Sequence, residues 1–253
     1  MRKVVRRFLK VLGVLVVLLL VGFGVLWLKL RHARPEGGET GAAADELARA
    51  IQNSVDAAAW QRTGAVEWRF RSHKHLWDKT RNLARVRWDD TEVLLDVHKK
   101  RGVVRRGGAT LTGKDADKAV DKAYAYFIND SFWLNPVVKL FDGGVTRTKY
   151  IVDGSAALMV HYSSGGVTPG DSYLWLLGSD GRPRAWRLWV KVLPIGGIEF
   201  SWEDWSKLPT GAWVAQMHKV GGRQAVTIAE VRAAATLGEL EADPFGALVG
   251  TGS

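Results

Sequence analysis

Cysteine is absent from the 253-residue sequence. Its absence excludes disulfide bonds, thiolate metal sites, cysteine nucleophiles and the lipidated N-terminal cysteine of a bacterial lipoprotein. The fold must therefore be stabilised by a hydrophobic core, and the roughly 200 residues beyond the N-terminal apolar run are enough to form one. Eleven of the twelve tryptophans lie in this part of the chain. Such bulky side chains must fill the core or line a groove.

Acidic residues are absent from positions 1–34. Eight of the 36 Lys and Arg residues lie there, which leaves 28 basic against 26 acidic residues and a net charge of +2 in the remainder. The formal charge of +10 is therefore concentrated at the N-terminus and does not indicate a basic surface on the folded domain. This distribution argues against nucleic acid as a partner.

Long apolar runs are also lacking, with one exception. Eighteen residues without a charge extend from Val11 to Leu28, which is enough to cross a bilayer as a helix. A cleaved signal peptide is the alternative, but its apolar region is about 7 to 15 residues long and ends at a small-residue cleavage site. The nearest Ala-x-Ala, Ala42 to Ala44, lies well downstream. We predict a transmembrane signal anchor at residues 11–30, preceded by a basic segment at residues 1–10.

Basic residues on the two sides of this run predict its orientation. Five Lys or Arg precede it, whereas Lys29, Arg31 and Arg34 follow it. Because the more basic flank stays in the cytoplasm, we expect a single-pass protein of the inner (cytoplasmic) membrane. Its N-terminus is expected in the cytoplasm and its domain in the periplasm.

The remainder reads as a linker at residues 31–44, one domain at residues 45–248 and a tail at residues 249–253. The linker is rich in Pro and Gly, as flexible spacers are. Apolar residues recur at three- and four-residue spacing over residues 45–60 and again over residues 115–127, which predicts two helices.

Most of the other segments alternate apolar and polar residues, the pattern of antiparallel strands with one buried face. Short turn signals separate several of them: Asp89-Asp90-Thr91, Asp153-Gly154, Asp180-Gly181 and Gly221-Gly222. We count nine to eleven strands and find no alternation of strands with helices. The expected fold is mainly β (α+β): one strongly curved antiparallel sheet or incomplete β-barrel with the two helices on its concave face.

Three motifs and the order of the elements indicate a relationship. The motifs are NDSFWLNP at residues 129–136, SGGVTPGDSYLW at residues 164–175 and DPF at residues 243–245. With them the chain resembles the periplasmic lipoprotein carriers of LolA-like fold, in an uncharacterised branch that carries no known activity. The resemblance implies a half-barrel closed by helices over an apolar cavity that shelters acyl chains. The retained anchor differs from the soluble carriers.

Aromatic residues on the predicted strands and helices are the candidates for such a cavity: Trp68, Phe70, Trp88, Tyr124, Phe127, Trp133 and Trp175. Residues of two mixed polar and apolar loops are the candidates for its rim: Asn129, Asp130, Phe132, Thr168 and Asp171. The alternative for residues 129–136 is a helix end that plugs the core. Trp186 and Trp189 must face opposite sides of a regular strand.

Few residues suggest catalysis. His73 and His75 lie two apart, so on a strand both would face one side and could share a zinc ion with Asp78. The third histidine would be His98, His161 or His218; the alternative is a polar loop between two strands. Gly170-Asp171-Ser172 imitates a hydrolase motif, but without GxSxG it reads as a turn in which Asp171 caps backbone N–H groups. We therefore predict no catalytic residue, cofactor or enzymatic activity.

The preferred function is a membrane-anchored, periplasm-facing binding protein that holds a lipid, an acyl chain or a lipidated protein. The second hypothesis is a non-catalytic structural or interaction module of the cell envelope with a solid core. The third is a metal-dependent hydrolase, which requires His73 and His75 to converge with an acid and another histidine. The sequence contains no signal for the oligomeric state.

Overall fold

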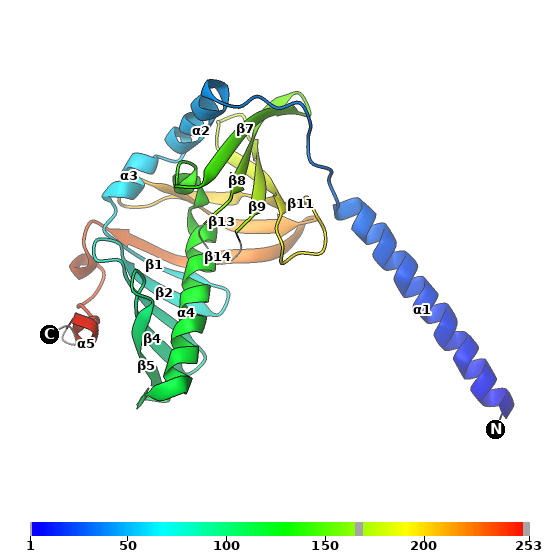
Figure 1. The fold of residues 1–253 in the computed structure, drawn as a ribbon, viewed down its shortest axis with the longest axis horizontal. Coiled ribbons are helices and arrows are strands. Elements are labelled where there is room, and N and C mark those ends of the chain that lie inside the picture. The colour runs from blue at the N-terminus through cyan, green and yellow to red at the C-terminus, as the bar shows by residue number, and fades with distance from the viewer. Residues whose placement is uncertain (1, 165–168, 250–253) are drawn as a thin grey trace.

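The computed structural model describes residues 2–164 and 169–249 (Figure 1). Helix α1 (Arg2–Leu30) projects away from the folded part, and its described apolar side chains are largely exposed. Residues 12–30 are long and apolar enough to span a membrane, a property that signal sequences share. The predicted N-terminal apolar helix is therefore present as a helix.

The first predicted helix is two helices. Helix α2 (Ala42–Ser54) ends near Asp56, where the backbone enters the left-handed region with φ 51°, and α3 (Ala57–Arg62) begins there. The Asp56 carboxylate accepts a hydrogen bond from the Ala59 N–H, so Asp56 caps α3. The periodicity of residues 45–60 was continuous across this break, which explains why the sequence predicted one helix.

The second predicted helix is longer than its pattern indicated. Helix α4 (Gly113–Leu134) continues through the segment that we expected to be a loop, and it ends only at Asn135. Pro136 then begins the short 3-10 helix η1 (Pro136–Lys139). A proline disfavours the helical conformation of the residue before it. Helix α4 therefore ends just before Asn135 and Pro136. The prediction of a loop at residues 129–136 was therefore wrong for residues 129–134, which form the end of α4, as the alternative of a helix end expected.

The strands form two antiparallel sheets, neither of which closes into a barrel. The nine-stranded sheet has the order β12-β13-β14-β1-β2-β3-β4-β5-β6. Its strands are β1 (Ala65–Phe70), β2 (His73–Asp78), β3 (Leu83–Trp88), β4 (Thr91–Asp96), β5 (Arg101–Arg106), β6 (Ala109–Leu111), β12 (Glu203–Lys207), β13 (Trp213–Val220) and β14 (Arg223–Ala234). The five-stranded sheet, ordered β11-β10-β9-β8-β7, contains β7 (Val145–Val152), β8 (Ser155–Tyr162), β9 (Asp171–Leu177), β10 (Pro183–Trp189) and β11 (Ile198–Ser201).

The expectation of one continuous sheet is thus corrected, while the antiparallel, mainly β class is confirmed. The chain leaves the first sheet through α4, builds the second sheet, and returns at Trp202, the single residue between edge strands β11 and β12. The predicted hairpin turns are present. At Asp153-Gly154 and Gly221-Gly222 both residues have positive φ, as two-residue turns of the primed type require.

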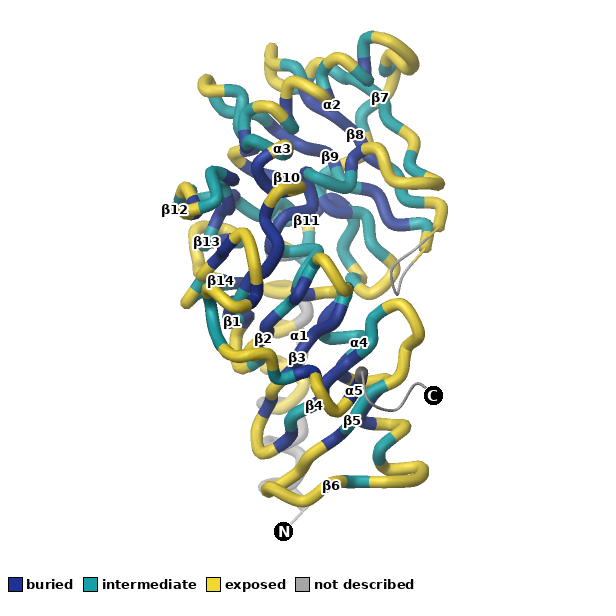
Figure 2. Tube along the Cα trace, turned by 90° about the vertical axis from the view of Figure 1, so that its left-hand side faces the viewer, coloured by how far each residue is buried: buried dark blue, intermediate teal, exposed yellow. Residues whose placement is uncertain are grey.

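Each sheet has its own buried core (Figure 2). Helix α4 lies against β3, β4 and β5 of the nine-stranded sheet, and α2 lies against β7 and β8 of the five-stranded sheet. Trp133 and Phe200 contact both cores and join them. Trp186 and Trp189 belong to clusters on opposite faces of the five-stranded sheet, as predicted.

Two segments outside the sheets and the long helices are fixed on the domain. Residues 31–41, expected to be a flexible spacer, are held by backbone hydrogen bonds between Glu39 and Lys149 and by two bonds from His32 to Gly196 and Gly197. Near the C-terminus, Phe245 of the DPF motif is fully buried in a cluster on the outer side of β2–β4, completed by α5 (Gly246–Val249). The other short 3-10 helix, η2, covers Leu237–Glu239.

Candidate functional site

The expected apolar cavity between sheet and helices is filled. Trp68, Phe70, Trp88, Phe127 and Trp175 are buried, with exposed fractions of 6% or less. Tyr124 and Trp133 pack around them. The rings of Trp68 and Phe127 lie 6.2 Å apart between β1 and α4, so α4 packs directly on the sheet. All seven proposed cavity residues therefore belong to the cores or pack against them, and of the seven only Phe127 also lines the cleft described next.

A partly open cleft of about 380 Å³ lies instead beside α4, where the two sheets meet. Its apolar wall is formed by Trp77, Phe127, Ile128, Phe132, Tyr162 and Tyr173. Polar groups border it, among them Asn129, Ser131, Lys139, Asp142 and Asp171. A concave, mainly apolar site with a few polar groups is typical of small-ligand binding, and this volume lies at the small end of the usual range of about 300–1,000 Å³.

The rim candidates are distributed between this cleft and other places. Asn129, Phe132 and Asp171 line the cleft, whereas Asp130 points into the protein interior and is buried. Thr168 lies outside the described residues. Asp171 is buried at the start of β9 and accepts a hydrogen bond from the Lys191 N–H. Asp171 thus accepts from a backbone N–H as predicted, but it lies in strand β9 and not in the predicted turn, and its partner Lys191 is 20 residues away.

Two of the residues that line the cleft are the tyrosines Tyr162 and Tyr173. Burial raises the pKa of the Tyr162 phenol and, together with the neighbouring Asp171, raises that of Tyr173, so both remain neutral donors at physiological pH. The buried Tyr162 hydroxyl has no hydrogen-bond partner among the described residues. Buried tyrosine hydroxyls usually have one. The hydroxyl oxygen itself is enclosed in the protein, so it is not accessible from the cleft in this arrangement.

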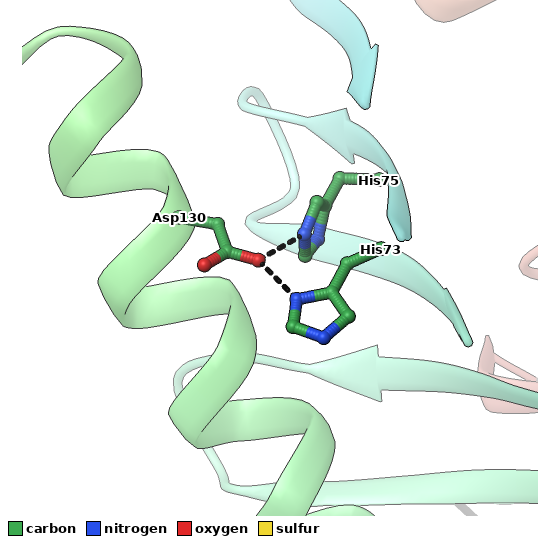
Figure 3. Close-up of side chains that lie close together, drawn as sticks. All are labelled: His73, His75 and Asp130. Atoms are coloured by element: carbon green, nitrogen blue, oxygen red, sulfur yellow. Dashed lines mark hydrogen bonds and ion pairs between the residues drawn. The ribbon is translucent and has the colours of Figure 1, made fainter. Parts of the chain in front are cut away.

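His73 and His75 converge on one carboxylate (Figure 3). Both lie on β2, two residues apart, and face α4, where Asp130 lies. Oδ2 of Asp130 is 2.8 Å from Nδ1 of His73 and 2.8 Å from Nε2 of His75. Because an ionised carboxylate only accepts, both imidazoles donate to it. The polar loop that we considered for this segment is strand β2.

The other proposed ligands of a metal ion lie elsewhere. Asp78 binds Arg81 through its Oδ2 atom at 2.6 Å. His98 is exposed in the turn after β4. His161 contacts the Ser172 hydroxyl at 2.9 Å, and His218 contacts the Ser201 carbonyl at 3.0 Å. The sequence missed Asp130 as a partner because it lies 55 residues from His75, and no spacing rule links a helix to a strand so far away.

Packing fixes the two imidazole rings. His75 stacks on Trp68 with ring centroids 4.6 Å apart, and His73 stacks on Tyr126 at 3.7 Å. Burial lowers the pKa of His75 below its ordinary value, against the opposing effect of Asp130, so this ring is neutral at physiological pH. The second carboxylate oxygen of Asp130 accepts a hydrogen bond from the Asn129 amide at 2.8 Å.

His161 and Ser172 form a cross-strand pair on β8 and β9. No carboxylate among the described residues hydrogen-bonds to His161, and Ser172 is buried. A nucleophilic serine needs a base that is itself oriented by a third group. The pair therefore lacks the arrangement that a hydrolase would require within the described part of the chain.

Comparison with known proteins assigns no family. No model of a known protein family matches the chain, and no curated protein matches it either. The resemblance to the LolA-like carriers, drawn from three motifs and the order of the elements, therefore stays a prediction.

Proposed function

We propose that this protein is a membrane-anchored, periplasm-facing binding protein that holds an acyl chain, supplied by a lipid or by a lipidated protein, in the cleft beside α4. The observation that carries the proposal is the cleft of about 380 Å³ with its apolar wall of six mainly aromatic residues. Burial of apolar ligand surface there would provide the affinity. The relationship to LolA-like carriers is part of the same proposal.

The size and the lining favour one slender apolar ligand. The interior between α4 and the sheet is filled with aromatic side chains, so the ligand occupies only the cleft. The polar groups of Asn129 and Ser131, which line the cleft, can bind a polar end group. A single acyl chain with a carboxyl or ester group combines these two features.

The anchor supports the same proposal. Helix α1 is apolar along residues 12–30 and exposed where it is described, and its more basic N-terminal flank is expected in the cytoplasm. A domain fixed at the periplasmic surface of the inner membrane has lipids and membrane-bound lipoproteins within reach.

Site-specific photocrosslinking in intact membranes tests the proposal. The full-length chain carries benzoylphenylalanine in place of Ile128, in the cleft wall, or in place of Ile151, which is 67% exposed on β7. After irradiation, mass spectrometry identifies the adducts. We expect an acyl-bearing adduct at position 128 and none at position 151.

A second variant tests whether the cleft itself is responsible. Ser131→Leu adds bulk to the cleft wall, whereas Ser179→Leu adds the same bulk to the exposed turn after β9. We expect the adduct at position 128 to decrease in the first variant and to persist in the second. Equal acyl labelling at positions 128 and 151, or no acyl adduct at either, contradicts the proposal. Crosslinks to proteins without acyl groups would favour the second hypothesis, a non-catalytic interaction module of the cell envelope. The filled core is compatible with that hypothesis as well.

A further inference from the structure

The buried cluster of His73, His75 and Asp130 is not explained by acyl-chain binding. None of the three side chains lines the cleft, yet their ligand atoms all lie within 4.8 Å of one another. We propose that these three residues bind one divalent transition-metal ion, through Nδ1 of His73, Nε2 of His75 and a carboxylate oxygen of Asp130. Two imidazoles and a carboxylate form a ligand set that suits zinc with a fourth, open position.

The distances require an adjustment of the three side chains. Ligand atoms at about 2.0–2.1 Å from a tetrahedral zinc ion lie about 3.3 Å from one another. Each histidine nitrogen lies 2.8 Å from Asp130 Oδ2, so each gap must widen by about half an ångström. The two histidine nitrogens lie within 4.8 Å of each other, so this third gap must narrow by up to about 1.5 Å. That change requires the two imidazole rings to turn toward each other as the Asp130 carboxylate rotates.

Burial and charge favour an ion at this place. The side chains of His75 and Asp130 are 0% and 1% exposed, and that of His73 is 16% exposed. A buried carboxylate is costly unless its charge is compensated, and a cation bound between Asp130 and the two imidazoles would compensate it. Solvent reaches the cluster at His73, so a water molecule can take the open position there.

The surroundings orient the ligands. Stacking on Trp68 and Tyr126 fixes the two rings, and the Asn129 amide holds the second oxygen of Asp130. Such partners of the ligands are typical of metal sites. On binding, each nitrogen that contacts Asp130 becomes a metal ligand without a proton, and each ring carries its N–H on the other nitrogen. Nδ1 of His75 has no hydrogen-bond partner among the described residues in the ion-free arrangement. Moving the proton to Nδ1 therefore turns this atom from an acceptor into a donor but adds no further unpaired atom.

Zinc stoichiometry tests the proposal. The full-length protein, purified in detergent through a tag without histidine, is treated with a chelator, equilibrated with zinc sulfate and separated from free ion. Elemental analysis should find about one zinc ion per chain. His73→Ala removes the most accessible ligand and should lower the affinity by about tenfold or more. His98→Ala removes an exposed histidine outside the cluster and should bind zinc like the wild type.

A second variant keeps all three ligands. Asn129→Ala removes the hydrogen bond to the carboxylate and should weaken zinc binding by about tenfold, which keeps the test decisive if His73→Ala does not fold. Circular dichroism verifies that each variant is folded. A wild-type protein that retains no zinc contradicts the proposal, as does zinc binding that neither His73→Ala nor Asn129→Ala weakens.

Discussion

His218 is a fully buried histidine outside the cluster of His73, His75 and Asp130. It is 0% exposed on β13 and lies against Trp202 and Trp133, with ring centroids 4.4 Å and 5.1 Å away. Burial lowers its pKa from 6.5 to about 4, although the Ser201 carbonyl and Glu203 act in the opposite direction. The residue therefore remains neutral in the folded protein at a pH where it is protonated in the unfolded chain.

This difference predicts a loss of stability in mild acid. Because the folded pKa lies below the unfolded pKa, the unfolded state binds the proton first as the pH falls through 6.5. Between pH 7 and pH 5 the free energy of unfolding should fall by about 2 kcal/mol through His218 alone. His218→Asn keeps a donor for the Ser201 carbonyl but does not titrate. Urea unfolding at both pH values should show a drop smaller by about 2 kcal/mol in this variant; equal drops would contradict the assignment.

At the scale of residues, the sequence predicted pairs within one strand better than partners between elements. Alternation placed His73 and His75 on one side of a strand, and Trp186 and Trp189 on opposite sides. The partner of the two histidines was assigned to Asp78, the nearest acid, whereas it is Asp130 on α4. Which carboxylate meets them depends on how a helix crosses the sheet, and local periodicity carries no information about that.

The break between α2 and α3 shows how one residue divides an element. Asp56 adopts φ 51° and ψ 60° and caps the first turn of α3. Asp56→Ala removes the cap and places an alanine in the left-handed region, so it should lower the free energy of unfolding by about 2–3 kcal/mol. Asp56→Asn tolerates the same backbone and retains a capping oxygen, so its cost should be within about 0.5 kcal/mol. Denaturant unfolding of both variants measures the difference, and similar values for the two would refute the capping role.

At the scale of elements, hairpins were predictable because their signals are local. Asp153-Gly154 and Gly221-Gly222 have the positive φ angles that their sequences favour. The division into two sheets was not predictable, because it depends on α4 separating β6 from β7 and on the single residue Trp202 between two edge strands. Helix α4 was predicted too short, because polar residues in its last two turns suggested a loop. One of these polar residues, Asp130, is buried in the helix and hydrogen-bonds to His73 and His75.

At the scale of the whole molecule, the connection between α1 and the domain depends on Gly197. A Cβ at this position would lie 2.3 Å from the His32 carbonyl oxygen. Gly197→Ala should therefore release residues 31–34 from the domain and increase the rate of trypsin cleavage after Arg31 by about tenfold, as the loss of hydrogen bonds worth about 1.4 kcal/mol implies.

Gly154→Ala is the matched control for this prediction. Gly154 has nearly the same positive φ as Gly197, 76° against 77°, but a Cβ there would have no neighbour within 4 Å. Both variants carry the same backbone strain, and only Gly197→Ala disturbs His32. Trypsin should cleave Gly154→Ala at the wild-type rate after Arg31. Similar acceleration in both variants would show that strain, and not the contact with His32, controls access.

The fixed linker also determines how the domain and the proposed ligand can meet. Eleven flexible residues between α1 and α2 would span about 18 Å on average, and a domain on such a tether would sample many orientations. Here the hydrogen bonds of His32 and Glu39 remove that freedom. If α1 is the anchor that we propose, the domain turns only with its helix and travels only by lateral diffusion. The domain and its ligand then meet by diffusion in the plane of the membrane. The ligand must reach a cleft that stays at one constant height above the bilayer.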